Sequence, residues 1–301
     1  LASLLLGSRG IIQGLDFVKN LDEPDNAALS VLLEQEKKRF AGSEIRGKTL
    51  GVVGLGAIGS LVANMAIDLG MKVLGFDPAL SVEAAWRLSH QVERMENLQS
   101  LLSKSDFVSL HLPMLEATRH LINDDTLSVV KPGCCLLNFA REGIVDTQAV
   151  IRSLDQPKSG LRCYISDFPV NELIRRNDVL LMPHIGASTE EAEENCAVMA
   201  ADQLKDFLCN GNIKNSVNFP ATYLERTSGY RLAISNRNIP KMLGHVLSVL
   251  ADANINVIDM INKSRDEIAY NLIDIETAPD NAILEAISSI EGVVNIRLLE
   301  A

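Results

Sequence analysis

Three side chains that could carry out proton transfer and anion binding each follow a short apolar segment of this chain. They are Arg141, Glu172 and His184, within Asn138-Phe-Ala-Arg-Glu-Gly-Ile-Val-Asp146, Asp167-Phe-Pro-Val-Asn-Glu172 and Pro183-His-Ile-Gly-Ala-Ser188. A guanidinium can bind a carboxylate through two parallel hydrogen bonds and polarise a carbonyl. An imidazole paired with a carboxylate can take up or release a proton near neutral pH. This set, downstream of a glycine-rich loop, indicates hydride chemistry on a hydroxy acid.

Taken singly, each of these residues also has an ordinary structural explanation. A partly buried histidine, a solvated glutamate and an arginine in a salt bridge are all common. Their shared position after expected strands favours a site, because ligands of open α/β sheets bind at the carboxyl ends of the strands. In such a site Glu172 would orient the His184 ring and favour its charged form.

The segments that position these residues alternate between strand and helix from Lys48 onward. An apolar strand at 49–53 leads into the glycine loop and a helix at 57–69, which Gly70 ends. Further strands are expected at 72–76, 107–112, 134–139, 161–166 and 179–182. This alternation predicts an α/β fold with a Rossmann-type, doubly wound parallel sheet.

The loop Gly54-Leu-Gly-Ala-Ile-Gly59 has the spacing of a dinucleotide-binding turn. Gly54 permits the tight turn, Gly56 lets the backbone approach a pyrophosphate, and Gly59 allows close helix–strand contact. Asp77 closes the second strand, where a carboxylate accepts hydrogen bonds from both adenosine ribose hydroxyls and repels a 2′-phosphate. We therefore expect NAD rather than NADP, although an Asp-Pro pair is also a common turn.

Other residues around these segments complete the expected cofactor site. Asp167 could accept a hydrogen bond from the nicotinamide carboxamide or cap a turn, and His111 lies in a loop expected to shape the site. The remaining candidates are Ala57, Ile58, Leu112, Pro113, Phe139, Ala140, Gly186 and Ala187, together with Arg141 and His184. We expect no metal, since no group of residues has zinc-ligand spacing.

A different order of elements follows. Ser188-Thr-Glu-Glu191 is typical of a capping box that opens a helix to Asn210, which Gly211 ends. Residues 212–227 indicate a linker. The elements expected at 230–235, 240–253, 255–262, 268–276, 281–290 and 293–299 have the β-α-β-β-α-β order of a ferredoxin-like domain. The expected domain boundaries are 1–43, 44–187, 188–228 and 229–301.

The composition argues against several classes of partner. The 301 residues carry a net charge of −11, which disfavours nucleic acid and anionic membranes. No apolar run approaches membrane-spanning length. The five cysteines are odd in number and lack C-x-x-C spacing, so we expect mostly buried, reduced thiols and a cytoplasmic protein. They are Cys134, Cys135, Cys163, Cys196 and Cys209.

With these motifs in this order, the chain resembles the D-isomer-specific 2-hydroxyacid dehydrogenases over roughly residues 41–301. The resemblance implies that Arg141 binds and polarises the substrate, that His184 is the acid/base, and that Glu172 supports the histidine. The C-terminal part looks like the ACT domain of one branch of the family. This implies 3-phosphoglycerate as substrate, and serine as a candidate ligand at Asn238 and Asn256. Residues 1–40 match the family's dimerisation arm, which implies a homodimer or homotetramer.

Three departures from the family pattern bear on these expectations. Glu142 and Lys241 each stand where the family usually has glycine, and Lys241 would obstruct serine. Family members also carry a substrate domain of order 100 residues before the helix that here begins at Leu1, so we expect an N-terminally truncated chain. Two alternatives stay open. One is another D-2-hydroxyacid dehydrogenase, acting for example on glycerate or lactate. The other is a non-catalytic module that binds NAD and a small amino acid.

Overall fold

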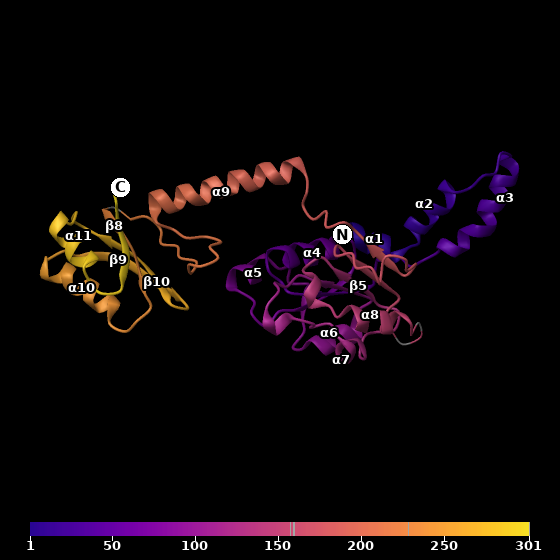
Figure 1. Ribbon diagram of the computed structural model, residues 1–301, viewed down its shortest axis with the longest axis horizontal. Coiled ribbons are helices and arrows are strands. Elements are labelled where there is room, and N and C mark those ends of the chain that lie inside the picture. Colours follow the sequence, from indigo (N-terminus) through magenta and orange to yellow (C-terminus); the bar gives the residue numbers. More distant parts are fainter. Residues whose placement is uncertain (157, 159, 228, 301) are drawn as a thin grey trace. The chain divides into compact units, whose positions relative to one another are not determined.

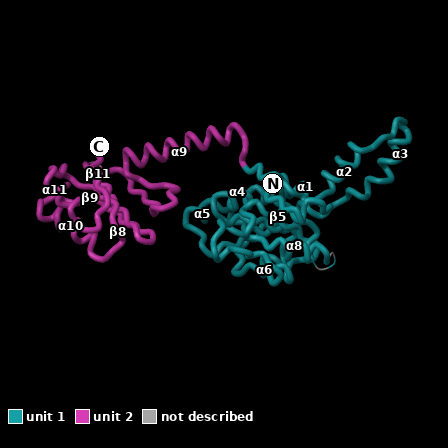
Figure 2. Tube along the Cα trace, viewed as in Figure 1, with its two compact units in different colours: residues 1–186 teal, residues 187–301 magenta. Residues whose placement is uncertain are grey.

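The computed structural model describes residues 1–156, 158, 160–227 and 229–300. These residues form two compact units (Figures 1 and 2), an N-terminal unit, Leu1–Gly186, and a C-terminal unit, Ala187–Ala301. None of the helices in the described part of the chain has the length and apolar character needed to cross a membrane.

A parallel sheet forms the centre of the N-terminal unit. Within the described residues it has seven strands in the order β3-β2-β1-β4-β5-β6-β7, and every neighbouring pair is parallel. The strands are β1 (Thr49–Val53), β2 (Lys72–Phe76), β3 (Glu93–Arg94), β4 (Phe107–Leu110), β5 (Cys135–Asn138), β6 (Cys163–Ser166) and β7 (Val179–Leu181). This order confirms the predicted doubly wound sheet.

Helices cover both faces of this sheet because neighbouring residues along each strand point to opposite faces. Val53 faces one core with helices α6 (Leu98–Lys104), α7 (Asp124–Leu127) and α8 (Thr147–Leu154). Val52 faces the other core with α1 (Ala2–Ser8) and α4 (Ala57–Asp68), while α5 (Val82–Arg87) contacts α4. The strands are therefore apolar on both faces, as buried parallel strands must be.

The first forty residues form a helical arm that joins the sheet through α1. Leu4 of α1 is buried, whereas α2 (Ile11–Lys19) and α3 (Asn26–Glu36) bury no residue. Figure 1 shows α2 and α3 extending away from the sheet side by side. The short helix η1 (Lys37–Phe40) returns the chain, and Phe40 contacts Phe17 with ring centroids 5.3 Å apart.

The expectation of mostly buried, reduced cysteines holds in full only for Cys134; two others are buried but not reduced, and two are free thiols but exposed. The structure joins Cys135 to Cys163 by a disulfide, with their Cα atoms 4.8 Å apart. They lie opposite each other on β5 and β6, a separation that a disulfide can bridge. Sequence spacing could not show this pairing, because a crossover separates the two strands. Cys134 is a buried thiol whose pKa desolvation raises to about 12, whereas Cys196 and Cys209 are exposed.

The C-terminal unit begins with the long helix α9 (Glu190–Asn210). Its N-cap is Thr189, whose hydroxyl accepts the Ala192 N–H at 3.1 Å, so the predicted cap at Ser188 is one residue early. The predicted stop is confirmed, because Gly211 adopts a left-handed conformation with φ +73°.

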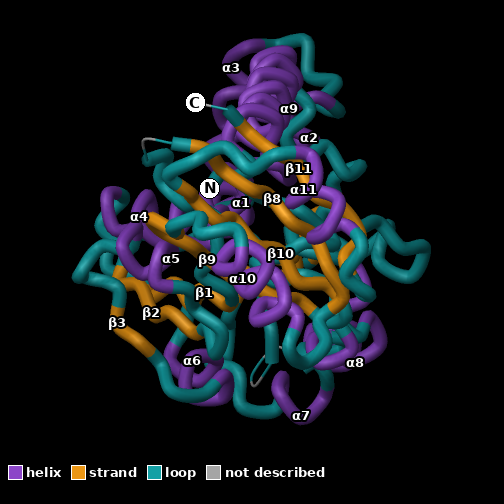
Figure 3. Tube along the Cα trace, turned by 90° about the vertical axis from the view of Figure 1, so that its left-hand side faces the viewer, coloured by secondary structure: helices purple, strands orange, loops and turns teal. Residues whose placement is uncertain are grey.

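The antiparallel sheet of this unit has the predicted ferredoxin-like element order. In the part that the structure describes, its strand order is β11-β8-β10-β9. The elements are β8 (Tyr230–Arg237), α10 (Met242–Asp252), β9 (Val257–Arg265), β10 (Ile268–Ile275), α11 (Asn281–Ser288) and β11 (Val293–Leu299). Both helices pack on one face of the sheet, against Leu232 and Ile234 (Figure 3).

Residues 212–227 pack against the other face of this sheet. Ile213, Phe219 and Leu224 contact the apolar side chains there. Arg231 is fully buried and pairs with Asp274, and its guanidinium also donates to the carbonyl oxygens of Asn210, Leu224 and Glu225. One buried cation therefore holds the end of α9 and the following segment on the sheet.

Candidate active site

The glycine loop after β1 is too tightly packed for side chains at two of its three glycines. Gly54 has φ +89°, and a Cβ there would lie 2.4 Å from the His111 carbonyl oxygen. A Cβ on Gly59 would lie 1.9 Å from the Gly54 carbonyl oxygen. Gly56, by contrast, has no atom within 4 Å of its Cβ position. The loop thus leaves open space at Gly56, beside the start of α4, where backbone N–H groups can bind an anion.

Asp77 connects the end of β2 to this loop. One carboxylate oxygen accepts the Leu55 N–H at 2.8 Å, and the other accepts the Ala79 N–H at 2.9 Å. The second bond is the turn contact that an Asp-Pro sequence favours. The first places the carboxylate beside the glycine loop, which suits the predicted ribose contact. The turn role of Asp77 is therefore seen directly, and the ribose contact stays a prediction.

His111, in the segment after β4, packs against Gly54 and Gly59 of the glycine loop. Its backbone N–H donates to the Val53 carbonyl at 2.8 Å, and its Nε2 lies 2.9 Å from the Ser109 hydroxyl. Burial lowers the pKa of His111 to about 4, so the imidazole is neutral near pH 7. Sequence reasoning missed Ser109, whose polar side chain in an apolar strand was the available signal.

Arg141 follows β5 and lies at the start of the short helix η3 (Glu142–Ile144). Its side chain is exposed, and its Nη1 donates to the Ala140 carbonyl at 2.6 Å. Asn138 holds this turn, since its amide donates to the Arg141 carbonyl at 3.0 Å and accepts the Ala140 N–H at 3.1 Å. Asn138 is fully buried. A buried polar residue at the end of an apolar strand was the signal for this positioning role, which sequence reasoning did not assign.

His184 follows β7 in a strained loop. It has φ +52°, an uncommon conformation for a residue with a side chain, and Gly186 has φ +54°. The buried Asp167 stabilises this loop, because its two carboxylate oxygens accept the Ile185 and Gly186 N–H groups at 3.2 Å each. Phe168 packs edge-on against the His184 ring at 5.1 Å. Such strain is often stored at functional sites.

Glu172 lies exposed in the segment between β6 and β7. Among the residues described, no hydrogen bond or ion pair joins it to His184. Catalytic hydrogen bonds are often long without substrate and shorten in the complex. The loops that carry Arg141 and His184 follow parallel strands and so lie at the same edge of the sheet. The contact between Glu172 and His184 stays a prediction.

The other expected site residues fall into four places. Phe139 and Ala140 precede Arg141, Leu112 and Pro113 follow His111, and Ala57 and Ile58 begin α4; Ala187 falls in the C-terminal unit. Within the described residues, no cluster of three His, Cys, Asp or Glu side chains is placed to hold a metal ion.

The two asparagines expected to bind an amino acid lie near the ends of strands in the C-terminal sheet. The Asn238 side chain donates to the Asp266 carbonyl at 3.0 Å, and the Asn256 carbonyl accepts the Glu276 N–H at 3.2 Å. Lys241 has φ +75°, a conformation that glycine adopts far more readily. It is thus a strained residue at the start of α10.

A comparison with known protein families supports the cofactor site described above. Residues 2–186 match the family model described as D-isomer specific 2-hydroxyacid dehydrogenase, NAD binding domain. The chain belongs to this family. The predicted membership of this dehydrogenase family and the NAD cofactor are thereby confirmed, and the glycine loop and Asp77 suit that cofactor.

Individual relatives carry one recurrent name. The D-3-phosphoglycerate dehydrogenase of Methanocaldococcus jannaschii is 33% identical over 235 residues, which cover 76% of this chain and 43% of that protein. The enzyme of that name from Haemophilus influenzae is 34% identical over 274 residues, 87% of this chain and 65% of that protein. The chain therefore spans between two fifths and two thirds of the length of these relatives.

A solved structure shows the same likeness. The NAD⁺-bound 3-phosphoglycerate dehydrogenase of Entamoeba histolytica matches with a TM-score of 0.51 and 30% identity. The match covers 61% of this chain and 58% of that chain.

Proposed function

We propose that this chain carries the cofactor-binding and acid–base part of an enzyme that oxidises 3-phosphoglycerate to 3-phosphohydroxypyruvate with NAD, the first step of serine biosynthesis. The observation that carries the proposal is that the Arg141 and His184 loops follow parallel strands at the same edge of the sheet as the glycine loop. The names of the relatives support this substrate.

The proposed roles follow from the chemistry of each side chain. Bound NAD supplies the hydride acceptor. Arg141 binds the substrate carboxylate and holds the reacting oxygen in line. His184 takes the proton from the C2 hydroxyl, and Glu172 stabilises the charged imidazole. Asp167 acts through the loop, because its bonds to Ile185 and Gly186 keep His184 in its strained position.

Three further parts of the proposal concern the whole protein. We assign the C-terminal unit as an ACT-type regulatory domain, on the strength of its element order. The helical arm, with its exposed apolar residues, is proposed as the surface of a homodimer or homotetramer. The cytoplasm is the proposed location, since serine biosynthesis is a metabolic pathway.

Substrate and mechanism are tested together by steady-state kinetics. We expect the enzyme that contains this chain to reduce 3-phosphohydroxypyruvate with NADH at a higher kcat/KM than hydroxypyruvate or pyruvate. A preference for an unphosphorylated acid would favour another D-2-hydroxyacid dehydrogenase. NADH binding without turnover of any of the three would favour a non-catalytic module.

A substitution of the histidine tests the assigned mechanism. His184→Asn removes the acid/base group, and asparagine tolerates the left-handed backbone at this position. We expect turnover to be lost, with NADH affinity within about twofold of the unmodified chain, because general acid–base groups contribute about 10²–10⁴-fold to rate. Calorimetric NADH titration and an NADH absorbance assay measure the two effects. Unchanged turnover would contradict the role of His184.

A further inference from the structure

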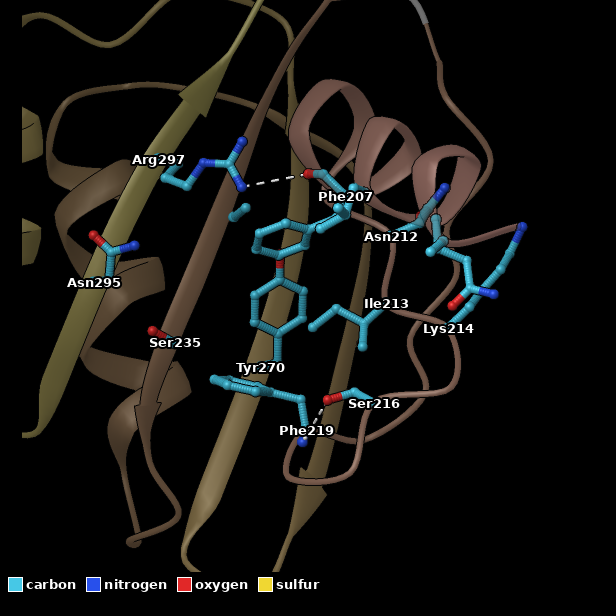
Figure 4. Close-up of a pocket in the computed structure, with 14 residues that line it drawn as sticks. Phe207, Asn212, Ile213, Lys214, Ser216, Phe219, Ser235, Tyr270, Asn295 and Arg297 are labelled. Atoms are coloured by element: carbon cyan, nitrogen blue, oxygen red, sulfur yellow. Dashed lines mark hydrogen bonds between the residues drawn. The ribbon is translucent and has the colours of Figure 1, made fainter. Parts of the chain in front are cut away.

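A cavity of about 420 Å³ in the C-terminal unit plays no part in the proposed reaction (Figure 4). It lies on the sheet face that α10 and α11 leave free, since Ala233 and Ser235 line it while Leu232 and Ile234 point to the helices. The second half of α9 and residues 212–219 form its other walls. Its volume falls within the range of about 300–1,000 Å³ that is usual for small-molecule sites.

Three aromatic rings form the apolar part of this cavity. Tyr270 lies between Phe207 and Phe219 in Figure 4, and it meets the Phe219 ring edge-on at 5.9 Å. The Tyr270 hydroxyl donates to the Gly211 carbonyl at 2.8 Å, so its polar end is already satisfied. Ile213 adds an aliphatic surface from the opposite wall. These groups suit a flat or branched apolar ligand body.

The polar part lies on β11, where Asn295 and Arg297 are two residues apart and point to the same face. The guanidinium of Arg297 lies 4.8 Å from the centre of the Phe207 ring. It donates to the Phe207 carbonyl at 3.3 Å and to the Leu208 carbonyl at 2.7 Å. A guanidinium has five N–H donors. The remaining donors of Arg297, and the amide of Asn295 on the same face of β11, suit a carboxylate.

Charge also favours an anion in this cavity. Among its described lining residues, Arg297 and Lys214 are basic and none is acidic, although the whole chain carries a charge of −11. Lys214 is paired with Asp206 at 3.2 Å. In the described part of the chain, Arg297 has no carboxylate partner. Arg297 is therefore the cation left for a ligand to neutralise.

We propose that this cavity binds a small monocarboxylic acid with an aromatic or branched aliphatic body. The carboxylate contacts Arg297 and Asn295, and the apolar body packs on Tyr270 and the two phenylalanines. This site differs from the one expected at Asn238 and Asn256, because neither of those residues lines the cavity.

Calorimetric titration of the full chain with 3-phenylpropanoate tests the proposal. We expect one molecule bound per chain, with the neutral 3-phenylpropanamide at least about tenfold weaker because it lacks the charge-assisted hydrogen bonds. Arg141→Ala should leave this binding unchanged, which separates the cavity from the carboxylate site of the proposed reaction. Loss of binding in Arg141→Ala would overturn the assignment to the cavity.

Two substitutions change the cavity itself, and a third is their control. Ser235→Leu fills the cavity from the strand, and Asn295→Asp places a negative charge beside Arg297; both should weaken binding at least about tenfold. Asn281→Asp makes the same chemical change at an exposed residue of α11, away from the cavity, and should have no effect. Three outcomes would each refute the proposal. They are equal binding of the acid and the amide, unchanged binding in Ser235→Leu and Asn295→Asp, and no binding together with concentration-dependent dimerisation through this face.

Discussion

Two glycines in the same loop should respond in opposite ways to the same substitution. Gly59→Ala places a Cβ 1.9 Å from the Gly54 carbonyl oxygen and 3.3 Å from the His111 Cβ, whereas ordinary contacts begin at 3.4 Å. Backbone must therefore move by about 1.5 Å, a degree of overpacking that typically costs about 1–3 kcal/mol. Gly56→Ala meets no atom within 4 Å, and its φ of −65° suits alanine.

The expected results separate folding from cofactor binding. Gly59→Ala should lower the Tm of the N-terminal unit by about 2–4 °C for each kcal/mol lost. Gly56→Ala should leave Tm within about 1 °C but weaken NADH binding at least about tenfold, because its methyl group occupies the space where a pyrophosphate approaches the backbone. Scanning calorimetry and NADH titration measure the two quantities. Full NADH affinity in Gly56→Ala, or an unchanged Tm in Gly59→Ala, would refute this reasoning.

Three other predictions concern the stability of the fold and the disulfide. Burial lowers the pKa of His111 in the folded chain to about 4, so as pH falls the imidazole is protonated in the unfolded chain before it is protonated in the folded chain. The free energy of unfolding should therefore decrease by up to about 3 kcal/mol between pH 6.5 and 4. Urea unfolding of His111→Gln should lack this decrease, and an unchanged pH profile would contradict the prediction. Burial raises the pKa of Asp274, but hydrogen bonds from Arg231 and Thr227 have a larger, opposite effect and bring the pKa below 3.8. The stabilisation that Asp274 gives the folded chain is present above pH 3.8 and is lost as pH falls through the lower folded pKa. Arg231→Met should lower the free energy of unfolding by about 3–5 kcal/mol at pH 7, because it leaves the Asp274 carboxylate without its cation. Equal stability of Arg231→Met and the unmodified chain in urea would oppose this. Peptide mapping without reductant should recover Cys135 linked to Cys163; recovery of both as free thiols would support the expectation from sequence instead.

The sequence alone determined the order of elements and the positions of the chemical groups. Apolar runs flanked by turn residues predicted the strands other than β3 to within one or two residues at most ends. In the parallel sheet this follows because burial on both faces leaves few polar positions. The two residues of β3 are polar and exposed, so this strand was missed. The motif around Arg141, the glycine loop and the His184 segment were visible as local patterns, since each depends on a few adjacent residues.

Only the tertiary structure decided which distant groups meet. The disulfide between Cys135 and Cys163 and the clamp of Asp167 on the His184 loop both join residues brought together by crossovers. Arginine is rarely fully buried, yet Arg231 is buried because residues 212–227 fold back over the sheet. Local propensity and periodicity describe one segment at a time. Contacts between segments depend on how the strands are ordered and on which face each covering segment packs.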